Sequence, residues 1–123
     1  MDNKDFFVHI CTCLSWEEAQ GPGEYRGPSL ETEGFIHCSR PDQVLTVANN
    51  FNQETPDLVI LWIDPQKVKN EIKYEPGSDN NDETFPHIYG PLNIDAVLAA
   101  YDFRPASDGV YQDVPGLKQV LKS

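Results

Sequence analysis

The sequence has few basic residues and no long apolar stretch. Its 123 residues include 9 Lys and Arg against 20 Asp and Glu, which gives a formal net charge of −11 at pH 7. Because binding to phosphate backbones needs rows of Lys and Arg, this charge argues against duplex nucleic acid and anionic membranes as partners. The longest apolar run, residues 58–63, is too short to span a bilayer, and no apolar leader follows the first residues. We therefore expect a cytoplasmic protein.

Cysteine is also scarce. Cys11, Cys13 and Cys38 are an odd number of thiols without the spacing of a zinc site, as is typical of the reducing cytoplasm. The chain length fits one domain, and 39% apolar residues with 11% aromatics are enough for one hydrophobic core. We expect a single domain over residues 1–103 and a C-terminal extension over residues 104–123, either packed or partly frayed.

Apolar patterns predict an α+β fold with short strands. Residues 57–64 form a continuous apolar run and are predicted to be a central strand, and residues 5–12 an inner strand. Four more strands are predicted at residues 35–38, 72–75, 85–92 and 96–103. One main helix is predicted after Ser39, to about residue 52. These elements predict a single domain around a mixed or antiparallel sheet.

Short helices and breaks follow from local signals. Ser15 and Glu18 have the spacing of a capping box, which predicts a helix that begins at Ser15 and ends near residue 20. Residues 21–28 are too rich in Gly and Pro for regular structure, and residues 29–33 predict one helical turn before Gly34.

Three histidines lie among apolar or aromatic neighbours. His9 and His37 fall within predicted strands, and His87 lies in the strand-like run FPHIY. Two interpretations stay open: each imidazole makes hydrogen bonds inside the core, or the three share a site. Thr12 and Ser39 follow two of the histidines at strand ends, where ligand-binding groups collect, and this favours a shared site.

Several common chemistries lack their sequence patterns. No two histidines have the spacing of metal ligands on one element, so we predict no metal. His37 and Cys38 are adjacent in a strand and point to opposite faces, so they cannot form a nucleophile–base pair. The glycine patterns of a hydrolase nucleophile turn, a P-loop and a dinucleotide-binding loop are absent.

Two tyrosines and two arginines are candidates for ligand binding. Tyr25 and Tyr89 lie in Gly/Pro-rich segments and are placed to stack on a flat ligand such as nicotinamide or adenine, with burial in the core as the alternative. Arg26 and Arg40 could bind a diphosphate, with surface ion pairs to neighbouring acids as the alternative.

The chain closely resembles the bacterial family called domain of unknown function 952 in four segments. They read GEYRGPSLETEGFIHCSRPDQVLTVANNF, LVILWIDP, IKYE and FPHIYGPLNIDAV. The resemblance covers residues 7–103 and depends on two unusual strings, EGFIHCS and FPHIYGPL. The name of this family assigns no activity to its members.

A more distant resemblance is to the catalytic portion of RNA 2′-phosphotransferases. The shared features are His9 on a first strand, Trp16 in the following helix, the run FIHCS at residues 35–39 and an apolar strand that ends in Asp64. Those enzymes belong to the ADP-ribosyltransferase fold, a split β-sheet that binds NAD in its cleft. The resemblance therefore implies an ADP-ribosyltransferase-like split sheet here, with NAD as the cofactor.

The same resemblance implies roles for individual residues. His9 would hold the nicotinamide-ribose side of NAD, and His37 and Ser39 would line the same cleft. His87 or Tyr89 would occupy the third motif position.

Two features of that family are missing or unassigned. The chain has neither the basic N-terminal module nor the arginine cluster that the RNA-processing enzymes use, which argues against RNA as the substrate. Many transferases of the fold also use a catalytic glutamate near the third motif. Glu75 and Glu83 are both nearby, and no shared motif assigns either of them.

The sequence therefore supports three hypotheses. The first is a transferase-like domain that binds NAD or an ADP-ribose-like small molecule and transfers at the nicotinamide ribose. The second is a non-catalytic module that binds a metabolite or peptide, and the third is a metal-dependent hydrolase. The candidate catalytic residues are His9, His37 and His87, and the candidate binding residues are Thr12, Tyr25, Arg26, Ser39 and Tyr89.

Overall fold

Strand β4, Leu58–Ile63, is the centre of the first sheet in the computed structural model, which describes residues 6–51, 57–76 and 84–117. It pairs antiparallel with β1, Phe7–Thr12, and with β8, Val97–Phe103. Every residue of β4 is buried. The continuous apolar run thus belongs to a central strand that is covered on both faces, as predicted.

The prediction that β1 is an inner strand is wrong, because β1 lies at the edge of this sheet. Its free side is closed at one point, where Val8 and Ser39 exchange two backbone N–H···O hydrogen bonds of 2.8 Å each. The strand is apolar on both faces because both faces are packed. An apolar pattern of this kind reports burial of faces and says nothing about the edge.

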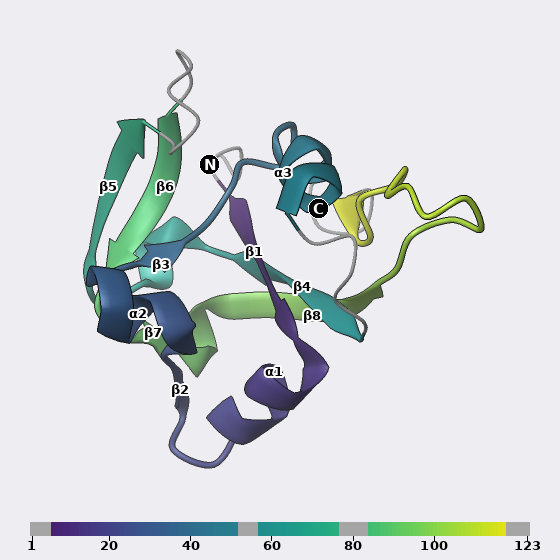
Figure 1. Ribbon diagram of the computed structural model, residues 1–123. Helices are drawn as coiled ribbons and strands as arrows, with labels where there is room; N and C mark the ends of the chain where they lie inside the picture. Colours follow the sequence, from purple (N-terminus) through teal and green to yellow (C-terminus); the bar gives the residue numbers. More distant parts are fainter. Residues whose placement is uncertain (1–5, 52–56, 77–83, 118–123) are drawn as a thin grey trace.

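A second antiparallel sheet stands beside the first (Figure 1). Its strand order is β3, Ile36–His37, then β6, Thr84–Tyr89, then β5, Glu71–Pro76. A small pair, β2 (Glu24–Tyr25) and β7 (Leu92–Asn93), completes the sheets of the described residues. The prediction that residues 21–28 lack regular structure is therefore wrong, since β2 lies within them.

The helices lie close to their predicted positions, with two corrections. Helix α1, Cys13–Ala19, is capped by Thr12, whose side-chain oxygen accepts from the backbone N–H of Ser15, so Ser15 is not the cap. Helix α2, Gly27–Glu33, ends at Gly34, which has the left-handed φ of 91° that such an end requires. Helix α3, Val44–Phe51, begins several residues after Ser39 because a turn precedes it.

Short 3₁₀ helices η1, Pro65–Lys67, and η2, Ile94–Ala96, connect the strands. Within the described ranges, no helix is long and apolar enough to cross a bilayer. The α+β class with antiparallel sheets and few helices is as predicted.

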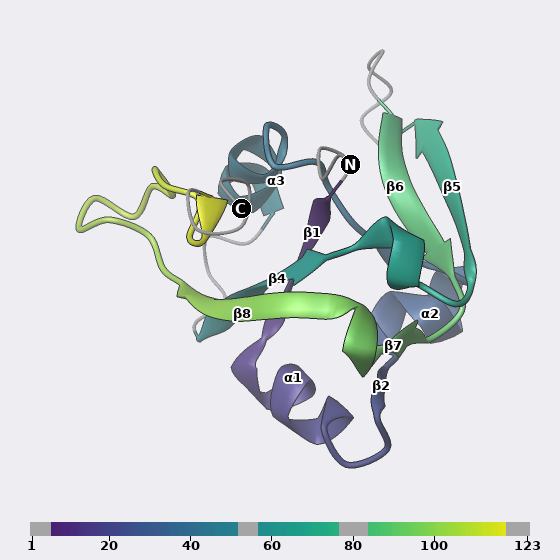
Figure 2. The ribbon, with the colours of Figure 1, turned by 180° about the vertical axis from the view of Figure 1, so that it is seen from behind.

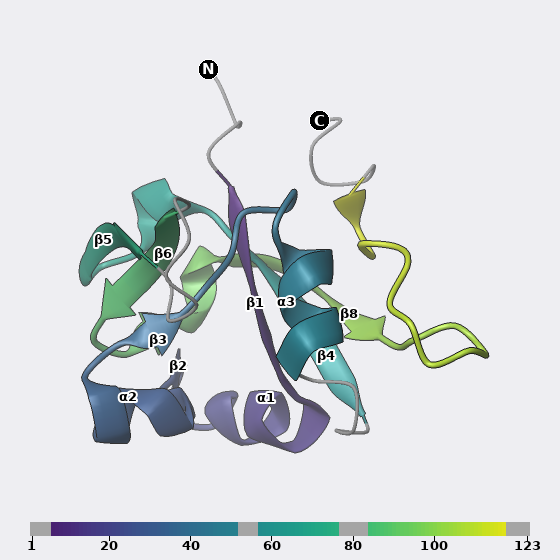
Figure 3. The same cartoon turned by 45° about the horizontal axis from the view of Figure 1, so that its top comes forward.

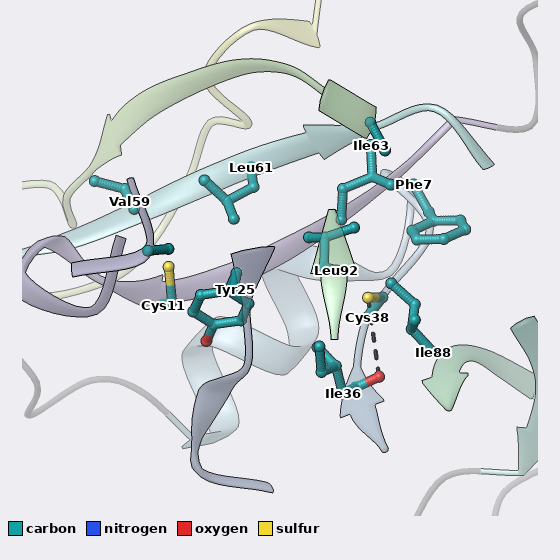
Figure 4. Packing of buried hydrophobic residues seen from close by; sticks show 12 residues of the cluster. Phe7, Cys11, Tyr25, Ile36, Cys38, Val59, Leu61, Ile63, Ile88 and Leu92 are labelled. Atoms are coloured by element: carbon teal, nitrogen blue, oxygen red, sulfur yellow. Dashed lines mark hydrogen bonds between the residues drawn. The ribbon is translucent and has the colours of Figure 1, made fainter. Parts of the chain in front are cut away.

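Hydrophobic cores lie on both faces of the first sheet. One fills the space between the two sheets and includes Phe7, Tyr25, Leu61 and Ile88 (Figure 4). The other lies under α3, where Val44 and Ala48, four residues apart and so on one side of the helix, pack with Trp62. Figure 3 shows α3 beside β1 and β4.

The segment after β8 packs onto this second core. Tyr111 is buried and its ring lies 4.6 Å from that of Phe103. Asn49 of α3 exchanges two hydrogen bonds with the backbone of Tyr111, and the indole N–H of Trp62 donates to the carbonyl of Pro115 at 2.8 Å. Residues 118–123 of the expected extension lie outside the described residues.

Candidate functional site

The two faces of the second sheet carry different kinds of side chain. Ile36 and Ile88 point into the core between the sheets, whereas their neighbours His37 and His87 point to the other face. His37 and His87 are direct partners across β3 and β6, and their ring centroids are 5.1 Å apart. Cys38 is buried, so it is separated from the His37 side chain as predicted.

Glu75 links two side chains of β6. Its Oε1 accepts from Nδ1 of His87 at 2.7 Å and from the hydroxyl of Tyr89 at 2.6 Å. These bonds favour the ionised carboxylate, so Tyr89 and then His87 hold the pKa of Glu75 below its ordinary value. Donation to that carboxylate raises the pKa of Tyr89. Glu75 is therefore an ionised group at neutral pH, with 34% of its side chain exposed.

An aromatic ring joins these groups to His37. Phe35 stacks on His87, with centroids 4.3 Å apart and planes at 17°, and also contacts the rings of His37 and Tyr89. His37 is the open member: 48% of its side chain is exposed, compared with 6% for His87. Its Nε2 lies 2.9 Å from Oε1 of Glu33 in α2.

We call this group the histidine cluster. Its members are Glu33, Phe35, His37, Glu75, His87 and Tyr89. Lys73, the β5 partner of His87, places its ammonium 4.8 Å from the centre of the Tyr89 ring. The arrangement combines two imidazoles, two carboxylates, partly exposed aromatic rings and one nearby cation.

The ring of His9 is connected to this cluster through the backbone carbonyl of His37. Nδ1 of His9 donates to the carbonyl of His37, and Nε2 accepts from the hydroxyl of Tyr25 at 2.9 Å. Since a carbonyl can only accept, the ring is the neutral tautomer with its proton on Nδ1. Burial of the imidazole lowers the pKa of His9 to about 4. Both of its nitrogens are thus occupied by protein atoms.

The bonds made by His9 lie where the two sheets meet. Val8, which precedes His9 in β1, forms backbone hydrogen bonds with Ser39, and the ring of His9 donates a hydrogen bond to the carbonyl of His37. We call this place the sheet junction.

The remaining predicted site residues lie elsewhere. Thr12 caps α1, and Ser39 is buried at the sheet junction. Tyr25 is 2% exposed and packs in the core, which is the alternative to stacking on a ligand that the sequence left open. In this fold its Gly/Pro-rich neighbourhood contains a strand that carries the ring inward.

Both arginines of the predicted phosphate site are engaged. Arg26 pairs with Glu24 at 3.2 Å, and Arg40 pairs with Asp42 at 3.1 Å and donates to the carbonyl of Thr84. The surface ion pairs that formed the alternative interpretation are thus present.

The structure adds residues that sequence reasoning did not assign. Glu75 lies beside His87 because β5 and β6 form a hairpin in which Lys73 is opposite His87. Glu33 reaches His37 from the end of α2, and Phe35 covers His87. The sequence allows β5 and β6 to be expected as neighbours, which would have pointed to Glu75 as a partner of His87. It does not define the register of that pairing, so the partner could not be assigned. Glu83, the other candidate glutamate, lies outside the described residues.

Three-ligand metal sites are not seen in the described part of the chain, where no group of three or more His, Cys, Asp or Glu side chains could hold an ion. The two imidazoles of the cluster each bond to a carboxylate instead.

Comparison with known proteins gives a consistent family assignment. A crystal structure of protein CC0527 from Caulobacter crescentus matches with a TM-score of 0.78 and 26% identity, over 87% of this chain and 93% of that chain. A solution NMR structure of the same protein matches with a TM-score of 0.74 and 26% identity, over 87% and 91% of the chains. No curated protein matches the sequence. The model of the family described as "Protein of unknown function (DUF952)" matches residues 10–100, and the chain belongs to this family.

Proposed function

We propose that this protein binds NAD or an ADP-ribose-like small molecule at the histidine cluster and transfers at the nicotinamide ribose. The observation that carries the proposal is Glu75, an ionised and partly exposed carboxylate held by His87 and Tyr89. When the bond between nicotinamide and ribose breaks, nicotinamide leaves with the electron pair and positive charge develops on the ribose. A fixed carboxylate stabilises that charge. An acceptor hydroxyl then bonds to the ribose carbon and releases its proton.

The aromatic members of the cluster support the nicotinamide part of the proposal. Tyr89 and Phe35 are partly exposed, and flat rings of this kind stack on flat ligands. Lys73 places its ammonium beside the ring of Tyr89 and is the group that we expect to face the diphosphate. Arg26 and Arg40 stay predicted phosphate ligands, although each would first have to leave an acidic neighbour.

The sheet arrangement supports an ADP-ribosyltransferase-like fold. Two three-stranded antiparallel sheets of the described residues meet at the β-bridge between Val8 and Ser39, as the halves of a split sheet would. His9 lies at that bridge, on the first strand, where the resemblance places the histidine of the nicotinamide ribose.

Isothermal titration with NAD and with ADP-ribose tests the proposal. We expect both ligands to bind, and we expect Glu75→Gln to weaken NAD binding about tenfold, because the ionised carboxylate that attracts the positively charged nicotinamide ring is lost. Glu18→Gln is the matched control, since it removes the same charge from an exposed carboxylate of α1 that is not a member of the cluster. Absence of heat at millimolar NAD would contradict the proposal, as would equal effects of the two variants.

His9 favours a second candidate function, which is binding without catalysis. Both of its nitrogens bond to protein atoms, so it must leave Tyr25 before it can hold a ribose. Chromatographic measurement of nicotinamide release separates the two functions. Release by the wild-type protein supports a transferase, whereas NAD binding without release supports a binding module.

A further inference from the structure

Strand β8 is an open edge of the first sheet. Among the strands of the described residues it pairs with β4 alone, and Figure 2 shows it running across the near side of the molecule. Leu98 is a bulge residue, because the register moves from Trp62–Ala99 to Ile63–Val97, and residues 99–103 are then regular. The regular part offers a template for another strand.

The Val8–Ser39 bridge shows in which direction the backbone N–H and C=O groups of β8 point. Val8 exchanges its hydrogen bonds with Ser39 and so turns away from β4, whereas its neighbours in β1 turn toward β4. The alternation continues through the register of β1, β4 and β8. By this alternation Tyr101 turns its N–H and C=O toward β4, whereas Ala100 and Asp102 turn theirs outward.

Two other edges, those of β1 and β5, are protected against pairing. The free side of β1 is closed at the sheet junction by the Val8–Ser39 bridge and by the bond from His9 to the carbonyl of β3. Strand β5 carries three charged residues in the run EIKYEP and ends in a proline, two devices that discourage strand addition. Strand β8, with the run VLAAYDF, carries one charge, Asp102. Its exposed residues include Leu98, which is 39% exposed.

We propose that β8 pairs antiparallel with β8 of a second copy of this chain, which forms a weak symmetric dimer. Two copies of a chain with a net charge of −11 repel each other, so contact is favoured where the surface carries least charge. An antiparallel pairing centred on Tyr101 places Asp102 opposite Ala100 of the other copy, and the reverse. The outward-facing groups of both residues would then bond to each other, and no two acids would be opposed.

A pair of opposite substitutions at Ala100 tests both the contact and its register. Ala100→Asp places an acid opposite Asp102 of the second copy, and we expect the dimer to weaken at least tenfold. Ala100→Lys places a base there, and we expect the dimer to be retained or strengthened at low salt, with the gain lost at high salt. Sedimentation equilibrium from about 10 µM to about 1 mM covers the range in which small interfaces associate.

Two results would overturn the proposal. One is that the wild-type protein stays monomeric over this range. This holds even if β8 is found to pair with a strand of a different protein. The other is an equal effect of the Asp and Lys substitutions, because self-pairing in this register requires opposite effects. Ala100 is exposed, so both variants should unfold at nearly the wild-type temperature, and thermal melts verify that a change in mass is not a folding defect.

Discussion

Substituting Gly116 with alanine is expected to lower the free energy of unfolding by about 3 kcal/mol. Gly116 has φ of 86°, a left-handed conformation that costs other residues about 1–2 kcal/mol. A Cβ at this position would also overlap the ring of Tyr101 and stand 2.6 Å from Nε1 of Trp62. Overpacking of this kind adds about 1–3 kcal/mol. The substitution therefore separates the C-terminal segment from the second core.

Gly109 provides the matched control for this experiment. Its φ of 84° is nearly the same, but no atom lies within 4 Å of the position of an added Cβ. Gly109→Ala should thus show the backbone cost alone, about 1 kcal/mol. Urea denaturation measures both variants against the wild-type chain. Equal losses would mean that the packing of Gly116 against Tyr101 and Trp62 contributes nothing to stability.

The parts of the fold that follow from local sequence were predictable. The run of residues 58–63 is buried on both faces, and a strand is its natural structure when it is that short. Gly34 ends α2 because a left-handed residue is required there, and glycine adopts that conformation without steric cost. Val44 and Ala48 lie four residues apart, so a helix places both on the same side, which is the buried side of α3.

Pairings between distant segments were not predictable from these patterns. The two residues of β2 form a strand only because Tyr25 and Glu24 pair with Leu92 and Asn93, which lie far away in the sequence. Likewise, the edge position of β1 depends on which strands flank β4, and burial patterns do not encode strand order. Thr12 displaced Ser15 as the cap of α1 because β1 ends directly at the helix.

The sequence pointed to the histidines of the candidate site but not to the residues that bond to them. His37 and His87 stand opposite each other, as a shared site requires, although His9 turns to a different environment. The position of Glu75 depends on the register of the β5–β6 pairing, and the sequence between the two strands gives no tight-turn signal of fixed length. The bond from His9 to a backbone carbonyl has no sequence signature at all.

Strand β3 connects the two halves of this arrangement. The side chain of His37 belongs to the histidine cluster, whereas the carbonyl of the same residue accepts from His9 at the sheet junction. A change in the charge of His9 should therefore act on the position of β3 as well as on stability.

Acidification is expected to destabilise the protein through His9, by about 2 kcal/mol between pH 7 and pH 5. Burial holds the pKa of His9 at about 4 in the folded protein, compared with the ordinary value of 6.5 for histidine, which we take for the unfolded chain. Below pH 6.5 the unfolded chain therefore binds a proton that the folded protein rejects. The stability that neutral His9 contributes is full above pH 6.5 and is lost as the pH falls toward 4.

His9→Gln isolates this effect, because glutamine can occupy the site and does not titrate. Urea unfolding of both proteins at each pH gives a difference in stability from which the titration of the acidic side chains cancels. We expect this difference to shrink by about 2 kcal/mol from pH 7 to pH 5, with the wild-type protein losing more. A constant difference would mean that His9 titrates alike in both states. In that case the bonds to Tyr25 and the His37 carbonyl would not keep the ring neutral, and the sheet junction would tolerate a charge.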